Sequence, residues 1–226
     1  MNNKRLIKAD FHMHTHFSPD SETDPDKLVK RCLKVGLELI AVTDHNTIEG
    51  ALKVKDLAPF PVIIGEEIKT SAGEITGLFL KETIPAGLSP IDTAHRIKDQ
   101  GGLVSLPHPF DRFRSEVIDG KAIDELIPLL DIVEIFNSRN NLSADDRKAE
   151  KFAKEHNLLT SGVSDAHTLM ELGRTYVQMP EFDGTPSDFK IALSKGTIVG
   201  KRMSPLIHIT TTLTRIKKKI IGRDRV

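Results

Sequence analysis

Hydrophobic and polar positions follow two alternating patterns along the chain, which predicts strands alternating with helices. Short apolar runs, such as residues 37–42 and 103–106, suit strands that are buried on both faces. Other segments, such as residues 25–36, carry apolar residues at spacings of three and four, which is typical of helices that pack against a sheet. The alternation continues through about seven strand–helix units with short loops. It therefore predicts an α/β fold in which a mostly parallel sheet closes into a barrel.

Local signals set the boundaries of these elements. Asp24-Pro25 and Ser89-Pro90 each join a good N-cap to a first-turn proline, and Gly36 ends the first of the two helices that follow. The predicted strands cover residues 6–9, 37–42, 61–64, 73–80, 103–106, 132–136, 158–163 and 175–179. The predicted helices cover residues 25–36, 48–57, 90–101, 122–130, 143–156 and 186–195.

Length and composition narrow the class of protein. With 226 residues, 38% of them hydrophobic, we expect a single barrel domain over residues 1–226, ending in a short basic helical tail at about 210–226. Lys plus Arg and Asp plus Glu number 32 each, so no overall charge favours long polyanions or membranes. Cys32 is the one cysteine, and the first residues lack the apolar core of a signal peptide. We therefore expect a cytoplasmic protein with no membrane contact and no obligate protein partner.

The strand that opens the chain leads into Asp10-Phe11-His12-Met13-His14. Because alternate side chains of a strand share a face, His12 and His14 converge on one point. An isolated His-x-His pair is ordinarily a solvated loop cluster, but here similar donors follow other apolar runs along the chain. They are Asp44-His45, Glu67, His108 and Asp165-x-His167. In a barrel, the loops after the strands meet at one mouth, so these residues are predicted to share one cavity.

The residue types in this set indicate metal chemistry. Neutral imidazoles and carboxylates bind zinc, manganese and iron, and the absence of thiolate ligands argues against a closed structural zinc site. Eight or more donors exceed the needs of one tetrahedral ion, which predicts two or three divalent metal ions. Such clusters activate water and stabilise the oxygens of a phosphoryl group, so hydrolysis of a phosphate ester fits best.

Five ordered motifs resemble those of the polymerase and histidinol phosphatase (PHP) superfamily. They are His12-x-His14, Thr43-Asp44-His45, Gly65-x-Glu67, Pro107-His108-Pro109 and Ser164-Asp165-x-His167, and the match runs from about residue 8 to residue 179. The resemblance implies a distorted (β/α)7 TIM-like barrel that holds a trinuclear metal site.

The resemblance also implies a ligand set and roles. It assigns one metal to His12, His14, Glu67 and Asp165, a second to Asp20, His45 and His167, and a third to Glu67 and His108. Many relatives have a histidine where this chain has Glu74, which is a chemically competent replacement. The expected catalytic residues are Asp165, His167, His45 and His12. We expect Asp165 and His167 to contribute little to folding, because relief of repulsion among the carboxylates offsets their loss.

Five further residues are candidates for substrate binding. Arg112, Arg114, Arg139 and Arg174 lie just beyond strand ends, where a guanidinium can bind phosphate, although a surface salt bridge is the ordinary role of any one of them. Asn137 ends a strand and either donates to substrate or caps the turn. In the tail, Ile216 and the isoleucines that follow have helical spacing, which predicts a terminal helix packed on the barrel.

The most specific hypothesis is a phosphoesterase that acts on nucleoside 3′,5′-bisphosphates or on the 5′ ends of short oligonucleotides. A histidinol-phosphate phosphatase is the alternative with the same chemistry. An amidohydrolase-type barrel also begins with His-x-His, but it uses a metal-bridging lysine that no strand end here offers. A non-catalytic PHP module would have lost ligands that this chain keeps. The sequence leaves open the physiological phosphoester, the native metal and the oligomeric state.

Overall fold

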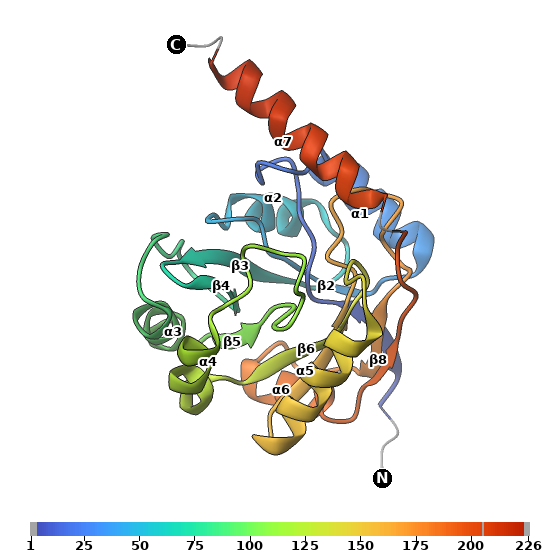
Figure 1. Ribbon diagram of the computed structural model, residues 1–226. Helices are drawn as coiled ribbons and strands as arrows, with labels where there is room; N and C mark the ends of the chain where they lie inside the picture. The colour runs from blue at the N-terminus through green and yellow to red at the C-terminus, as the bar shows by residue number, and fades with distance from the viewer. Residues whose placement is uncertain (1–3, 205, 224–226) are drawn as a thin grey trace.

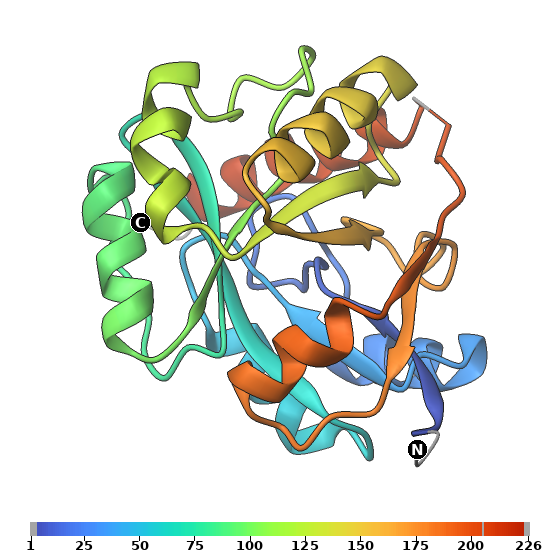
Figure 2. The same cartoon turned by 90° about the horizontal axis from the view of Figure 1, so that it is seen from below.

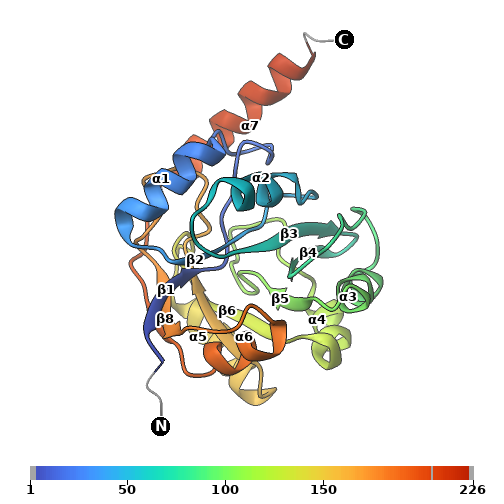
Figure 3. The same ribbon diagram turned by 180° about the vertical axis from the view of Figure 1, so that it is seen from behind.

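Nine strands form one curved sheet in the computed structural model, which describes residues 4–204 and 206–223 (Figure 1). Hydrogen-bonded neighbours follow the order β7-β6-β5-β4-β3-β2-β1-β8-β9, and the helices surround the sheet (Figure 3). The sheet curls so far that β7 lies against β8 and β9 without a ladder between them. The predicted α/β class and distorted barrel are therefore confirmed.

The elements alternate as expected. The strands are β1 (Leu6–Asp10), β2 (Leu39–Val42), β3 (Val62–Thr70), β4 (Gly73–Leu78), β5 (Leu103–Leu106), β6 (Ile132–Asn137), β7 (Leu159–Val163), β8 (Tyr176–Pro180) and β9 (Thr197–Val199). The helices are α1 (Pro25–Val35), α2 (Glu49–Leu57), α3 (Pro90–Asp99), α4 (Gly120–Leu126), α5 (Ser143–Glu155), α6 (Pro186–Leu193) and α7 (Ile207–Arg223), with a 3-10 turn at Ile127–Leu129. Asp24 and Ser89 cap α1 and α3 with their side chains, as the sequence predicts.

The sheet is not wholly parallel. The β1–β2, β2–β3, β5–β6 and β6–β7 pairs are parallel, whereas β4 is antiparallel to both its neighbours and β8 is antiparallel to β1 and β9. The strand predicted at residues 61–64 in fact continues to Thr70, because it forms a hairpin with β4. Glu67 consequently lies within a strand and not in the loop after it. The hairpin also starts β4 at the mouth, which brings Glu74 there.

Hydrophobic packing closes the end of the barrel opposite the mouth. In Figure 2, which looks from below, α6 crosses that end. Phe189 of α6 is fully buried, and its ring makes edge-to-face contacts with Phe11, Phe79 and Phe182 at centroid distances of 5.1, 5.3 and 5.4 Å. At the seam, Gly162 of β7 lies so close to Ile198 of β9 that an added Cβ would be 2.3 Å from its Cγ2 atom. This packed base leaves the mouth as the open end.

The terminal helix α7 lies over the mouth and extends beyond the barrel (Figure 1). Ile207 at its start is buried, but four later apolar side chains face solvent at spacings of three and four. They are Ile209, Leu213, Ile216 and Ile220, each more than half exposed. Thr211, on the other face, is buried against the barrel. The last residues of the expected tail, 224–226, lie outside the described residues. Over residues 4–204 and 206–223, each helix is too short or too polar to span a bilayer.

We predict that Glu66 makes the metal-free protein less stable as pH rises. Burial raises the pKa of Glu66 to about 7. The carboxylate accepts a hydrogen bond from the backbone N–H of Ile84 at 2.9 Å, and this bond opposes the shift. The folded state therefore binds this proton more tightly than the unfolded state, whose pKa is 4.5, and the stabilisation is lost as pH rises through about 7.

Glu66→Gln should leave the free energy of unfolding unchanged near pH 5 and raise it by ~1–3 kcal/mol near pH 8, since one pKa unit corresponds to ~1.4 kcal/mol. Urea denaturation in the presence of a chelator measures both values. Asp10, whose pKa burial also raises to about 7, should keep part of the pH dependence in the variant. An equal effect of the substitution at the two pH values would contradict this account.

Candidate metal centre

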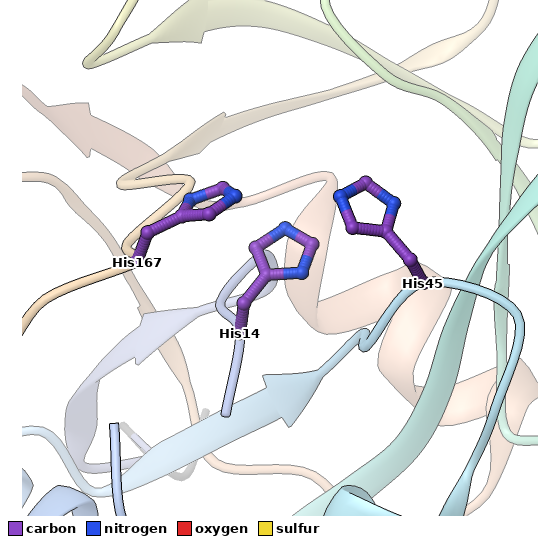
Figure 4. Close-up of side chains that lie close together, drawn as sticks. All are labelled: His14, His45 and His167. Atoms are coloured by element: carbon purple, nitrogen blue, oxygen red, sulfur yellow. The ribbon is translucent and has the colours of Figure 1, made fainter. Parts of the chain in front are cut away.

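The barrel mouth gathers the nine predicted metal donors from six different strands or the loops that follow them. His12, His14 and Asp20 follow β1, His45 follows β2, Glu67 lies in β3, Glu74 opens β4, His108 follows β5, and Asp165 and His167 follow β7. Figure 4 shows three of their imidazoles side by side, with His14 between His45 and His167. The ring centroid of His14 is 4.6 Å from that of His45 and 4.1 Å from that of His167.

The donors assigned to the first metal converge on one point. His12 Nε2 lies 3.1 Å from His14 Nε2, 3.2 Å from Glu67 Oε2 and 3.6 Å from Asp165 Oδ1. His14 Nε2 lies 3.4 Å from Glu67 Oε2 and 3.5 Å from Asp165 Oδ1. All four side chains are buried.

A second group lies beside the first. Asp20 joins two imidazoles, with Oδ2 3.4 Å from His45 Nε2 and Oδ1 3.4 Å from His167 Nε2. His45 Nδ1 faces the other way, at 3.3 Å from Glu67 Oε2 and 3.5 Å from Glu74 Oε1.

The third group contains the departure from the family pattern. His108 Nε2 lies 3.1 Å from Glu67 Oε1 and 3.9 Å from Glu74 Oε2. Glu74 therefore lies beside His45 and His108, and Glu67 contacts all three groups.

These spacings fit a divalent ion such as zinc. Ligand atoms ~2.0–2.2 Å from a tetrahedral ion are ~3.3–3.6 Å apart, close to the spacing of the first group. Two buried carboxylate oxygens, Asp20 Oδ1 and Asp165 Oδ1, accept no hydrogen bond from any described residue, although each faces imidazole nitrogens. Unpartnered buried oxygens are unfavourable unless a cation occupies the space between the donors. The donor set can therefore bind divalent metal ions.

The backbone holds two of these donors in an unusual conformation. Asp165 has a φ of +52° and His108 a φ of +30°, both in the left-handed region that residues other than glycine adopt rarely. Each residue follows the end of a strand, and the turn directs its side chain back across the mouth. Such strain persists only when the surrounding structure enforces it, and it is typical of functional sites.

Residues outside the predicted set hold the imidazoles in place. Glu134 of β6 lies 2.7 Å from His12 Nδ1 through Oε1, and its Oε2 accepts hydrogen bonds from the backbone N–H of His108 and from Asn137 Nδ2. A carboxylate on the other ring nitrogen fixes the tautomer and orientation of a metal-binding histidine. The sequence analysis missed Glu134, although a carboxylate within a buried apolar strand was a signal available in the sequence.

Asp44 helps to orient His14 through Ser18. Its carboxylate accepts hydrogen bonds from Thr15 N, Thr15 Oγ1 and Ser18 Oγ at 2.6–2.7 Å. Ser18 Oγ in turn lies 3.0 Å from His14 Nδ1. Gly50 permits this arrangement, because a Cβ there would be 1.9 Å from Asp44 Oδ2.

In the metal-free cluster, burial and neighbouring charges both shift the pKa values of the donors. Burial raises the pKa of Glu74 to about 8, with repulsion from Glu67 in addition. Burial opposes protonation of His45, but Glu67 and Asp20 outweigh it and raise its pKa to about 9. Burial lowers the pKa of His14 to about 3, assisted by His167, so His14 is neutral. Metal binding at this site therefore displaces protons from Glu74 and His45.

Arg114 revises one expectation about Asp165. Arg114 Nη2 lies 2.5 Å from Asp165 Oδ2, and Arg114 Nε lies 3.1 Å from Asp111 Oδ2. Although burial opposes ionisation of Asp165, the charge of Arg114 keeps its pKa well below the usual range. An ionised, paired carboxylate stabilises the metal-free fold, so loss of Asp165 should destabilise it, contrary to the expectation from like-charge repulsion alone.

A cavity of about 470 Å³ lies against the donors. Five donors form part of its wall, and they are Asp20, His45, Glu67, Glu74 and His167. Asp111 and residues 113–116 form another part, and His208, Thr211, Thr212 and Arg215 of α7 complete it together with Arg139 and Asn141. His208 was not among the residues that the sequence analysis expected at the site, because nothing in the sequence indicates which face of α7 meets the barrel.

The predicted substrate-binding residues differ in their access to the cavity. Arg114 and Arg139 line it, whereas Asn137 is buried outside its wall and donates to Asp165 Oδ2 at 3.2 Å. Arg112 instead forms a salt bridge with Asp145 of α5 at 2.8 Å, and Arg174 is exposed; neither belongs to the cavity wall.

Histidines and carboxylates gathered at the mouth of a barrel in this way are typical of metal-binding α/β-barrel proteins. The sequence matches the PHP domain over residues 10–107 and the PHP-associated region over residues 145–198. It is 44% identical over 147 residues to the uncharacterised protein MJ1587 of Methanocaldococcus jannaschii, a match that covers 58% of this chain and 82% of that protein. MJ0417 of the same organism is 35% identical over 183 residues, covering 78% and 72%. The chain belongs to the PHP family.

Two solved structures share the fold. A two-domain protein from Bacteroides vulgatus, described as containing a predicted PHP-like metal-dependent phosphoesterase, superposes with a TM-score of 0.72 at 20% identity, covering 89% of this chain and 66% of that chain. The lesion-specific endonuclease PfuEndoQ from Pyrococcus furiosus superposes with a TM-score of 0.58 at 18% identity, covering 89% and 60%. The chain therefore spans about two thirds of these larger proteins.

Neighbouring glutamates of β3 provide a matched test of the metal centre. Glu67 faces the imidazoles, whereas Glu66 faces the opposite side of the strand and accepts the N–H of Ile84. After loading with manganese or zinc, elemental analysis should find more than one ion per wild-type chain. We expect Glu67→Gln to lose at least one ion, because Glu67 contacts all three donor groups, and Glu66→Gln to keep the wild-type content. Equal metal content in the two variants would rule out Glu67 as a ligand.

Proposed function

We propose that this protein is a metal-dependent phosphoesterase that hydrolyses phosphate mono- or diesters of nucleotide type. One observation carries the proposal, namely a cluster of nine imidazole and carboxylate side chains, five of which line an open cavity. Manganese, zinc or iron at these donors would activate a water molecule and stabilise the charge of a phosphoryl group. Membership of the PHP family and the phosphoesterase-like structural neighbour support the same class of reaction.

We assign the metals to the three groups described above, with Glu67 shared among them. Asp165, His167, His45 and His12 are the proposed catalytic residues, because each offers a ligand atom to the cluster, and His45 and His167 also line the cavity. Glu134 and Asp44 are positioning residues, since they contact imidazoles or their neighbours and not the cavity. Arg139 is the proposed substrate contact because it lines the cavity, and the sites of Asn137, Arg112 and Arg174 outside the cavity wall do not support that role.

Cavity size and charge favour a short substrate. A volume of about 470 Å³ is in the range that holds a nucleotide-sized ligand. The equal numbers of acidic and basic residues give no global attraction for long nucleic acid. The fold shared with a lesion-specific endonuclease supports a short oligonucleotide end as an additional substrate. Histidinol phosphate remains the alternative within the same chemistry.

The other two classes of function receive less support. An amidohydrolase-type centre needs a bridging lysine, and no lysine is among the described residues that line the cavity. A non-catalytic module needs no open cavity beside its metal donors and no strained backbone at Asp165 and His108.

The test is a substrate panel assayed with manganese, zinc and magnesium. The panel holds a nucleoside bisphosphate, mononucleotides, short oligonucleotides, sugar phosphates and histidinol phosphate. Asp165→Asn and His167→Ala should each lower kcat/KM at least ~1000-fold, since each removes a ligand worth several kcal/mol of transition-state stabilisation. Asparagine tolerates the positive φ at position 165.

Glu66→Gln is the control, because it removes a buried carboxyl group that lies next to Glu67 in the chain but faces away from the imidazoles. Near wild-type hydrolysis by both ligand variants would show that the cluster is not the catalytic centre. Absence of phosphoester hydrolysis by metal-loaded wild-type protein across the panel would refute the proposed function.

A further inference from the structure

Helix α7 lies on the barrel through a face that is mainly polar. Most of its buried or partly buried side chains recur at spacings of four and three, and they are Ile207, Thr211, Thr214 and Lys218. Thr211 Oγ1 accepts a hydrogen bond from Arg139 at 3.1 Å. Lys218 Nζ donates to three backbone carbonyls of residues 16–21 at 2.6–2.7 Å. Hydrogen bonds therefore hold the helix on the barrel, with little apolar burial.

The opposite face of α7 carries an apolar stripe that is open to solvent. Its five residues alternate at spacings of three and four, and they are Leu206, just before the helix, and Ile209, Leu213, Ile216 and Ile220. Their exposed fractions range from 52% to 68%. At 3.6 residues per turn, these positions lie on the side of the helix away from Thr211 and Lys218. The isoleucines that were expected to pack on the barrel thus face away from it.

The spacing of this stripe is that of a coiled-coil seam. Strict alternation of three and four places Leu206, Leu213 and Ile220 at the a positions of a heptad, and Ile209 and Ile216 at the d positions. The flanking e and g positions are polar, and they are Thr210, Thr212, Lys217 and Lys219. The exposed apolar surface is therefore one side chain wide, which is the width that one further helix covers.

The exposure of this stripe is unfavourable for the isolated chain. Helices in water are stabilised mainly by burying an apolar face against another element, whereas α7 leaves that face in solvent. Figure 1 shows the helix extending past the edge of the barrel, so its outer part stands clear of the sheet and the other helices. A partner helix on the stripe would bury apolar side chains that the barrel does not reach.

We propose that α7 pairs with α7 of a second copy of this chain and forms a two-helix coiled coil. A second copy offers a stripe with the same spacing, and a two-fold axis lets the same positions face each other. Each barrel packs on the face of its own helix opposite the seam. The two barrels therefore lie on the outer sides of the helix pair and do not compete for the space between the helices.

The composition of the helix favours a second copy over a lipid surface or a larger assembly. Helices that lie in a membrane interface usually present aromatic residues, and residues 206–223 contain no Phe, Tyr or Trp. A larger helical bundle would also bury Lys217 and Lys219, which is unfavourable for charged side chains. In a two-helix pair both lysines stay in solvent, and Lys217 keeps its ion pair with Glu22 at 2.6 Å.

Pairing would also fix one wall of the cavity. His208, Thr211, Thr212 and Arg215 of α7 line the cavity, and Arg215 Nη2 lies 2.8 Å from Asp20 Oδ2. A partner on the outer face would hold α7 in a single position over the mouth. The dimer seam and the cavity wall are thus opposite faces of the same helix.

The test is sedimentation equilibrium of the full-length protein from about 1 to 100 µM, a range that detects micromolar affinity. Wild type should approach twice the chain mass of 25.1 kDa as concentration rises. The seam variant is Leu213→Glu/Ile216→Glu, and Leu213→Met/Ile216→Met keeps the seam apolar. Ile191→Glu on α6 is the matched control, because Ile191 is 55% exposed on a different helix.

The seam variant should raise the dissociation constant at least ~100-fold, because four apolar side chains of the dimer are replaced by charged ones. The methionine variant and Ile191→Glu should associate as wild type does. The seam variant should keep the circular dichroism spectrum of the dilute wild type, since residues 213 and 216 are exposed in the single chain.

Hydrogen exchange on wild type locates the interface without any substitution. Backbone amides of α7 should exchange more slowly at the high end of the concentration range than at the low end, because pairing suppresses local opening of the helix. Amides of α6 should exchange at the same rate at both ends.

Three results would overturn the inference. The first is the mass of a single chain for wild type at every concentration. The second is association that the seam variant retains, or slower exchange confined to elements other than α7. The third is binding of monomeric wild type, but not of the seam variant, to vesicles of anionic phospholipid, which would assign the stripe to a membrane surface.

Discussion

Four carboxylates buried together at the barrel mouth impose the main constraint on this structure. Asp20, Glu67, Glu74 and Asp165 are each at most 6% exposed, and their charges repel one another in a region of low dielectric constant. Burying even one unpaired charge costs several kcal/mol, so the cluster requires compensating cations. In the metal-free protein, Arg114 and protonated imidazoles supply part of that charge. Divalent metal ions would supply this positive charge at a higher charge density. Donors that repel one another in the metal-free protein can therefore bind metal.

The barrel makes this cluster possible by separating the apolar base from the charged mouth. Phe189 and the strand residues around it bury the opposite end, which provides apolar packing that does not involve the donors. Six strands then present their donors from different directions, and the positive φ angles at His108 and Asp165 complete the set. Glu134 and Asp44 fix the imidazoles from behind. Function is thus concentrated at one end of a scaffold that is stabilised at the other.

The sequence predicted the metal donors because they follow apolar strands, and the carboxyl ends of parallel strands meet at one edge. The same logic failed where the chain reverses direction. The β3–β4 hairpin could not be recognised from the apolar pattern, since β3 carries charged residues that are buried at the mouth. Glu134 was missed because a single carboxylate in an apolar strand pattern carries no indication of its partner. Its role depends on a contact with His12, which is 122 residues away in the sequence. The side of α7 that meets the barrel was not predictable, because the helix buries its polar face.

The most direct test of this account is anomalous diffraction from crystals of the metal-loaded protein, with data collected at the manganese or zinc absorption edge. The account predicts at least two anomalous peaks at the mouth. One should lie within bonding distance of His12 Nε2, His14 Nε2 and Asp165 Oδ1, and another beside Asp20 and His167. A single peak at the mouth, or peaks only at other surface sites, would contradict the proposal that this cluster binds two or more metal ions.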